Sequence, residues 1–428
     1  MQHISLLPSS FDAAEVLPRR LARYRDDANY FVNAIVRKNV RNRCDKRGRA
    51  GLRAEYLRKI MSFRHYHDVI ESLLEAGVIH RAPYWVGKYP FRYWLDYRFR
   101  GDKHVRVPVE NKRLQRKIGD AIARTKARTE KRLLPIHRKL KRIQRRLSID
   151  PDQAQCVLQD LPEDSNPFDA QGIQVADIQE QRFRLTVGNC GRVFNNITSL
   201  KRDLRRTLRC DGNPLVGLDI SCCQPSLLAL LMLRFTPPGK GKNVTSYKAS
   251  LCLPPLPLLS SVSGRLSDCC SFPSVERFAD LCLSGSLYQF LSKALAENGH
   301  PATLSQVKQR FLCDVLAKRK ANRLGAEYPS EIEQIFKGEF PSVWQFIRIV
   351  NGQGWQHWEL IRILQQVESW LVIQNVCQRF VDKHPEEFLI TLHDAIYVRP
   401  DAVELARTAF EDVFADLDFP MTLKVGSG

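Results

Sequence analysis

Residues 213–231 read NPLVGLDISCCQPSLLALL, and this stretch decides the fold that we expect. A turn at Asn213-Pro214 precedes a short apolar strand, which ends at Asp219 just before an apolar helix. A carboxylate at the end of a strand is held rigidly at the edge of a sheet, where a metal ligand must sit. The same pattern is also typical of an aspartate that caps the N-terminus of a helix. Asp219 is therefore a candidate metal ligand, with a helix cap as the alternative.

A second block, FLITLHDAIYV at residues 388–398, predicts a β-hairpin with an acid at its tip. The alternative for Asp394 is an ordinary turn aspartate. Two carboxylates from distant parts of a chain suit Mg²⁺, which prefers oxygen ligands and keeps water and phosphate oxygens as the others. Two such ions would activate a 3′-hydroxyl and stabilise a leaving pyrophosphate. Asp219 and Asp394 thus predict a site for two Mg²⁺ ions, with Mn²⁺ as a substitute.

A third block lies upstream, where residues 188–200 read GNCGRVFNNITSL and Leu204-Arg205-Arg206 follows. The order of the three blocks resembles the family A DNA polymerases, in which a Gly-Arg segment leads to an Asn/Leu-rich turn, an Arg and the motif A strand. The family's motif A is Asp-Tyr-Ser-Gln-x-Glu and its motif C is His-Asp-Glu. The chain has DISCCQ at 219–224 and HDA at 393–395. The resemblance covers about residues 185–425, and phage-type single-subunit RNA polymerases share the same layout.

The resemblance implies an α+β fold, in which an antiparallel palm sheet carries helical fingers and no proofreading exonuclease precedes it. It implies that the backbone carbonyl of Ile220 is a further metal ligand and that Lys308 is a catalytic residue facing the incoming triphosphate. Gln224 would meet the ribose 2′ edge, and Arg310 would contact phosphate. The residues implied to contact nucleic acid are Arg192, Arg205, Arg206 and His393.

Several positions depart from the family pattern. Gln224 stands where the DNA enzymes have Glu and the RNA enzymes have a small residue, and Ala395 replaces the Glu of motif C. Leu304, Leu316 and Ala317 replace the Arg and the aromatic-Gly pair of the fingers helix. Because Gln has nearly the volume of Glu but can also hydrogen-bond a hydroxyl, we expect a preference for dNTPs that is weaker than the family norm.

The N-terminal half is strongly basic. The chain of 428 residues has a net charge of +20, and residues 101–150 hold 17 Lys or Arg against 5 Asp or Glu. Blocks of this kind attract polyanions, because each phosphate that they neutralise releases counterions. Residues 101–149 predict a long basic helical region, thumb-like in position. The side chains expected to face phosphates are Lys112, Arg113, Arg116, Lys141, Arg142 and Arg145.

Residues 1–100 predict a helical, nucleic-acid-binding domain. The order of helix, short strand, turn and aromatic strand between residues 66 and 95 is that of a winged helix, with a generic α+β lobe as the alternative. Residues 150–180 are acidic and predict a linker, and 181–428 predict the palm and fingers with an insertion at 236–274. Twelve cysteines without a zinc-ribbon spacing indicate thiols in a reducing compartment, which favours the cytoplasm.

We therefore expect a metal-dependent nucleotidyltransferase, with a template-directed DNA polymerase as the leading form. An RNA-synthesising or primer-making enzyme is the first alternative, and a catalytically retired palm that binds nucleic acid is the second. The expected partners are DNA or RNA and nucleoside triphosphates. A membrane is not expected, because no run of about 18 apolar residues exists.

Overall fold

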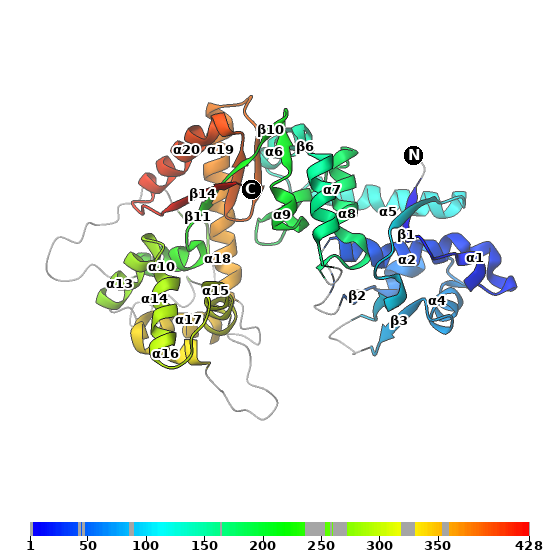
Figure 1. The fold of residues 1–428 in the computed structure, drawn as a ribbon, viewed down its shortest axis with the longest axis horizontal. Coiled ribbons are helices and arrows are strands. Elements are labelled where there is room, and N and C mark those ends of the chain that lie inside the picture. Colours follow the sequence, from blue (N-terminus) through cyan, green and yellow to red (C-terminus); the bar gives the residue numbers. More distant parts are fainter. Residues whose placement is uncertain are drawn as a thin grey trace. The chain divides into compact units, whose positions relative to one another are not determined.

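The computed structural model describes residues 3–41, 44, 48–84, 90–162, 165–235, 253–256, 259, 272–317, 330–352 and 359–427 (Figure 1). The fold is mixed α/β with several small sheets, which agrees with the expected α+β class. None of the described helices combines the length and apolar composition that a membrane span needs. The chain forms an N-terminal unit (1–133, 147–185 and 195–212) and a C-terminal unit (134–146, 186–194 and 213–428).

The N-terminal unit begins with α2 (Arg25–Val40), β2 (Ala50–Gly51), α3 (Ala54–Ile60) and α4 (Tyr66–Glu75). Strands β3 (Ile79–Ala82) and β4 (Arg92–Leu95) follow and form an antiparallel sheet in the order β2-β4-β3. The helix, strand, turn and strand expected from the sequence are therefore present, although residues 85–89 of the turn lie outside the described residues. One face of α2 supplies the core, and the buried Phe31 ring meets Tyr93 of β4 edge-on at 5.0 Å.

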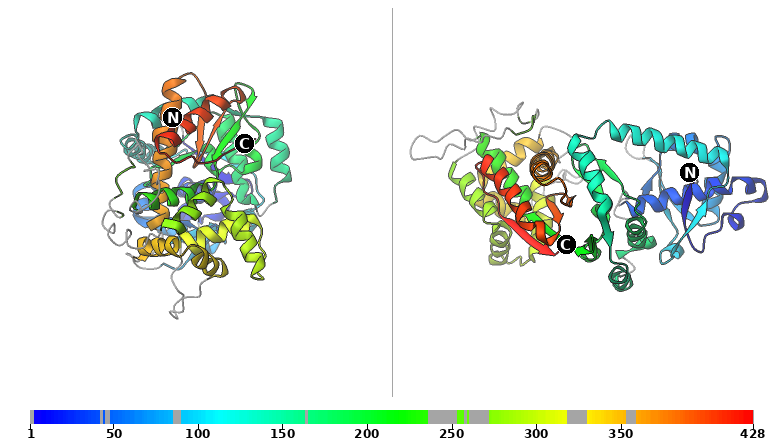
Figure 2. Two further views of the ribbon diagram at one scale, coloured as in Figure 1. Left: turned by 90° about the vertical axis from the view of Figure 1, so that its left-hand side faces the viewer. Right: turned by 90° about the horizontal axis from the view of Figure 1, so that it is seen from above.

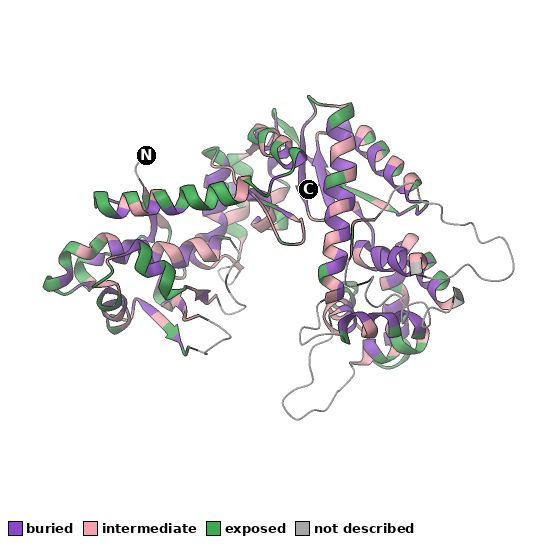
Figure 3. Cartoon of the chain, turned by 180° about the vertical axis from the view of Figure 1, so that it is seen from behind, coloured by how far each residue is buried: buried purple, intermediate pink, exposed green. Residues whose placement is uncertain are grey.

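Helix α5 (Lys112–Glu130) follows strand β5 (His104–Pro108), which pairs with β1 (Ile4–Pro8). The side chain of Asn111 caps the helix by accepting a hydrogen bond from the Leu114 backbone N–H at 3.0 Å. Only Leu114, Ile118 and Ala121 of α5 are buried, and most of the helix faces solvent (Figure 3). A helix with so narrow an apolar stripe keeps most of its cations exposed.

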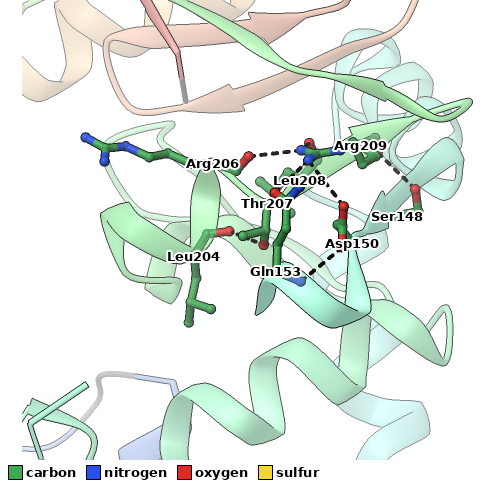
Figure 4. Close-up of polar contacts among 8 residues, drawn as sticks. All are labelled: Ser148, Asp150, Gln153, Leu204, Arg206, Thr207, Leu208 and Arg209. Carbon is green, nitrogen blue, oxygen red and sulfur yellow. Dashed lines mark hydrogen bonds and ion pairs between the residues drawn. The ribbon is translucent and has the colours of Figure 1, made fainter. Parts of the chain in front are cut away.

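Residues 150–180, expected to form a linker, are largely helical. They form α7 (Pro151–Asp160) and α8 (Ala170–Gln179). Asp150 caps α7 by accepting from the Gln153 N–H at 3.1 Å, and Pro151 takes the first helical position, a helix-start signal. Arg209 fastens this helix start to strand β9 (Leu208–Cys210), because its guanidinium reaches both Asp150 and Gln153 (Figure 4). Strand β9 pairs with β6 (Leu147–Ile149).

The remaining elements of the N-terminal unit are short. They are α1 (Ala13–Val16), η1 (Arg19–Tyr24), η2 (Tyr97–Phe99), η5 (Pro167–Asp169), η6 (Asn196–Ser199) and α9 (Arg202–Arg205). Strands β7 (Leu185–Val187), β8 (Val193–Asn195) and β10 (Asn213–Pro214) lie where the chain leaves or enters this unit.

The C-terminal unit is built on a four-stranded antiparallel sheet in the order β12-β13-β11-β14. Its strands are β11 (Val216–Ile220), β12 (Leu389–Leu392), β13 (Ala395–Val398) and β14 (Leu423–Ser427). Helix α20 (Val403–Asp416) packs against β11, after the short η9 (Pro400–Ala402). The long orange helix beside the sheet in Figure 1 consists of α18 (Glu359–Ser369), η8 (Trp370–Cys377) and α19 (Gln378–Lys383).

A group of helices completes this unit, beside the sheet in the views of Figures 1 and 2. Phe278, Phe311, Phe336 and Phe340 form its aromatic core, with ring centroids 5.3–5.9 Å apart. Most of the expected insertion at 236–274 lies outside the described residues. The helices are α10 (Cys223–Phe235), α13 (Phe272–Leu283), α14 (Leu287–Glu297), α15 (Leu304–Arg310), η7 (Phe311–Leu316), α16 (Glu331–Glu339) and α17 (Pro341–Gly352); α6 (Pro135–Ile143) and η3 (Gln144–Arg146) also belong to this unit.

Candidate active site

Asp219 and Asp394 lie side by side on the central strands of the sheet. Strands β11 and β13 are antiparallel neighbours, and Asp219 pairs with Ala395, the residue after Asp394. A two-residue turn of His393 and Asp394 joins β12 to β13, and His393 has a φ of 55°. This left-handed conformation costs a residue other than glycine about 1–2 kcal/mol. The hairpin therefore presents Asp394 at its tip beside Asp219, which is the juxtaposition that the two acidic blocks predict.

The two carboxyl groups oppose one another's ionisation. Burial, followed by the negative charge of Asp394, raises the pKa of Asp219 to about 6. Burial also raises the pKa of Asp394, although a hydrogen bond with the Asp219 carboxyl acts in the opposite direction. Two acids this close ionise one after the other, and the pair holds a proton more readily than a lone carboxylate does. A bound cation would favour the ionised form of both.

Three basic side chains act on this acidic pair. Lys308 of α15 and Lys424 of β14 lower the pKa of Asp219, while Lys308 and Arg192 lower that of Asp394. Lys424 stands directly opposite Asp219 in the pairing of β11 with β14. The structure thus brings the predicted Lys308 to the acids and adds Lys424, which the sequence analysis missed. Alternation along the last strand was the signal that could have found it.

The acidic pair fits a divalent cation. The Asp219 Oδ1 atom is buried and has no hydrogen-bond partner among the described residues. Within those residues no group of three or more His, Cys, Asp or Glu side chains is arranged to hold a metal ion, so the acids number two. Mg²⁺ is commonly bound by one or two carboxylates while water and substrate phosphates complete its shell. Ile220, whose carbonyl the resemblance adds as a ligand, is the last residue of β11.

A third acid, Glu368 of α18, organises the residues behind the pair. Its side chain is only 1% exposed, and burial raises its pKa to about 7. Arg192 donates to both carboxylate oxygens, at 2.8 Å from Nε and 2.6 Å from Nη2. The Gln224 amide also donates to Glu368. Glu368 therefore holds in place two residues predicted to contact nucleic acid or the nucleotide.

Glycine 191 explains how Arg192 reaches this buried acid. Gly191 has a φ of 79°, and a Cβ atom there would lie 2.9 Å from the Ser369 Oγ atom. Only a residue without a side chain lets the segment approach α18 so closely. The sequence analysis missed Glu368, although a single acid inside the apolar run VESWLVI at 367–373 was an available signal.

The other predicted residues are distributed over both units. Arg310 forms an ion pair with Glu331 and is not among the main charges acting on either aspartate. The His393 ring meets Phe194 edge-on at 6.2 Å. The basic residues expected to contact nucleic acid separate into Lys112, Arg113, Arg116, Arg205 and Arg206 in the N-terminal unit and Lys141, Arg142 and Arg145 in the C-terminal unit.

The basic region expected at 101–149 therefore divides between the units at residue 134. Arg206 points away from the polar network around Arg209, whose own guanidinium is engaged within the unit (Figure 4). No protein-family model matches this chain, and a search of curated proteins finds no matching relative.

Proposed function

We propose that the chain is a metal-dependent nucleotidyltransferase that extends a 3′-hydroxyl, with template-directed DNA synthesis as the leading form. The observation that carries the proposal is the pair of buried, mutually opposed carboxylates on β11 and at the tip of β12–β13, with Lys308 and Lys424 beside them. In this interpretation the four-stranded sheet is the palm and the helices from α13 to α17 are the fingers.

Asp219 and Asp394 would hold the divalent cations, together with the Ile220 carbonyl. Such cations lower the pKa of an attacking hydroxyl and neutralise charge on the leaving pyrophosphate. The protein's own contribution is positioning: the sheet fixes both carboxylates, and burial keeps them poised to exchange a proton for a cation. Lys308 carries positive charge at the rim and is placed to pair with a triphosphate or to donate a proton to the leaving group.

Arg192, Glu368 and Gln224 form a polar platform beside the acids. Because Glu368 accepts from the Gln224 amide, the Gln224 side chain is restrained in one orientation. A restrained Gln at the ribose edge excludes a 2′-hydroxyl by volume, although its amide can also hydrogen-bond that group. This arrangement supports a moderate preference for deoxynucleotides. Arg192, engaged by Glu368, acts in this proposal by positioning Gln224 and by its charge near Asp394.

An incorporation assay tests the proposal. Labelled dNTPs or NTPs are offered with primed and unprimed templates, in Mg²⁺ and in Mn²⁺, to the wild type, to Asp394→Asn and to Asp401→Asn. Asp401 is an exposed acid of the same unit, paired with Arg399 at 3.1 Å, and serves as the matched control. We expect template-dependent incorporation that Asp394→Asn reduces by about 10³-fold, the order found when a preorganised charge contact is removed.

The arms of the assay separate the alternatives. Incorporation of NTPs alone, or on unprimed template, would establish the RNA-synthesising or primer-making form in place of the DNA polymerase. Incorporation by neither wild-type arm, or equal incorporation by the wild type and Asp394→Asn, would contradict the proposal and favour a palm that only binds nucleic acid.

A further inference from the structure

A groove runs between α3 and α5 in the N-terminal unit. A cavity of about 520 Å³ lies where α3 ends and α5 begins, and a second of about 510 Å³ continues along α5. The cavities share Ile60 and Lys117, so we treat them as one feature, the α3–α5 groove. Arg113 and Arg128 mark its extent, because they lie 15 residues apart on one helix, or about 22 Å along its axis.

Positive charge dominates the walls of the groove. Asp27, one of its two acids, is only 3% exposed and accepts a hydrogen bond from the Ser62 N–H at 2.6 Å, so it serves the fold. The other acid, Asp120, is exposed. Four arginines, at 64, 113, 124 and 128, form no ion pair with any described residue. The cations that line the groove are Arg23, Lys59, Arg64, Arg113, Lys117, Arg124 and Arg128.

Aromatic side chains are interleaved with these cations. Phe63, in the loop between α3 and α4, is 71% exposed, although an apolar ring of this size is normally buried. Tyr24 stacks on His65 with ring centroids 4.8 Å apart, and Tyr56 on α3 is 48% exposed. Flat apolar faces next to unpaired cations match a ligand that has both bases and phosphates. The faces can stack on bases while the cations follow the backbone.

The neighbouring helix α4 is poorly suited to a duplex. It is the second helix of the helix pair that precedes the β3–β4 hairpin, the position from which a helix-turn-helix reads the major groove. Its outward side chains include the acids Asp68, Glu71 and Glu75, which repel phosphates. Bases can reach Phe63 and Tyr24 only when they are unstacked from a partner strand, and this condition favours a single strand.

We propose that the α3–α5 groove binds single-stranded nucleic acid, with its bases on Phe63 and the Tyr24–His65 stack and its phosphates along α5. Crowding of the cations agrees with this role, since burial and the charge of Arg113 lower the pKa of Lys117. The inference rests on the N-terminal unit alone, so it stands or falls separately from nucleotidyl transfer at Asp219 and Asp394.

The aromatic part of the proposal is tested with Phe63→Ala and a matched control, Tyr97→Ala. Tyr97 is also 71% exposed but does not line the groove, so both changes remove an exposed ring at little cost to folding. Binding of full-length protein to a fluorescein-labelled oligothymidylate of about 20 nucleotides is followed by anisotropy, without divalent cations. We expect Phe63→Ala to weaken binding on the order of tenfold and Tyr97→Ala to leave it unchanged.

The charged part is tested with the pair Arg124→Ala/Arg128→Ala against Arg98→Ala/Lys103→Ala, which removes the same charge from outside the groove. The groove pair should lower the slope of log affinity against log salt by about 1.4, or 0.7 for each phosphate contact. Equal effects of the two pairs, Phe63→Ala binding like the wild type, or tighter binding of a duplex of the same length would each overturn the proposal.

Discussion

The two units use charge in opposite ways. In the C-terminal unit the important charges are buried, few and mutually opposed: Asp219, Asp394 and Glu368 have raised pKa values and lie against Arg192 and the lysines. In the N-terminal unit the groove cations are exposed, numerous and alike in sign. Buried charge is costly unless it is paired, whereas exposed charge is screened by water and salt. Changes at the first kind of site should therefore alter stability, and changes at the second should alter affinity.

The largest stability effect is expected at the Arg192–Glu368 ion pair. Arg192→Ala would leave Glu368, which is 1% exposed, without its main partner. Breaking a buried pair by removing one member costs about 3–5 kcal/mol, because the other charge stays buried and uncompensated. Urea unfolding at neutral pH measures this loss. Arg192→Ala/Glu368→Gln should recover a part of it, and a loss below about 1 kcal/mol for Arg192→Ala alone would show that the pair contributes little.

A smaller, pH-dependent effect is expected at Asp219. Its pKa in the folded protein is raised from 3.8 to about 6, so its ionisation destabilises the fold as pH rises through this window. Asp219→Asn should therefore raise the melting temperature in EDTA near pH 8 and change it little near pH 4, with a free-energy gain of about 1–3 kcal/mol. Asp401→Asn is the control. An equal shift of the Asp219→Asn melting temperature at both pH values would exclude the raised pKa as its cause.

Sugar selection should change by a still smaller free energy. In Gln224→Ala the amide that donates to Glu368 is lost, and room for a 2′-hydroxyl is gained. One hydrogen bond contributes about 1 kcal/mol net, so relative use of NTPs should rise about fivefold. Competing incorporation of a labelled dNTP and the matching NTP measures the ratio. An unchanged ratio would mean that Gln224 does not meet the ribose.

The smallest stability effect is expected in the α3–α5 groove. Arg124 and Arg128 are exposed and form no ion pair with any residue that the structure describes, so replacing both with Ala should change the free energy of unfolding by about 0.5 kcal/mol or less. Urea unfolding beside the anisotropy measurement checks this. A loss comparable to that of Arg192→Ala would remove the contrast between the two units.

The local blocks of the site were readable from sequence because each is short and has strong signals. An apolar strand ending in Asp219 and a two-residue turn at Asp394 are set by nearest neighbours, and antiparallel pairing then brings them together. The linker at 150–180 was mispredicted for a related reason. Its acidic composition outweighed the Asp150-Pro151 helix-start signal that the structure uses.

Long-range contacts were less accessible. Glu368 lies 176 residues from Arg192 and 144 from Gln224, and no local pattern indicates that the three meet. Lys424 comes opposite Asp219 only through the register of the last strand. The assignment of residues 134–146 to the C-terminal unit likewise depends on tertiary packing, because α5 and α6 look alike in charge and periodicity.

The central claim is that Asp219 and Asp394 together bind a divalent cation, and direct Mn²⁺ binding tests it best. Electron paramagnetic resonance reports free Mn²⁺ as the ion is titrated into wild type, Asp219→Asn/Asp394→Asn and Asp401→Asn. We predict binding to the wild type and to Asp401→Asn near pH 8, loss of that binding in the double variant, and weakening towards pH 6 as Asp219 takes up a proton. Equal Mn²⁺ binding by the wild type and the double variant would contradict the account.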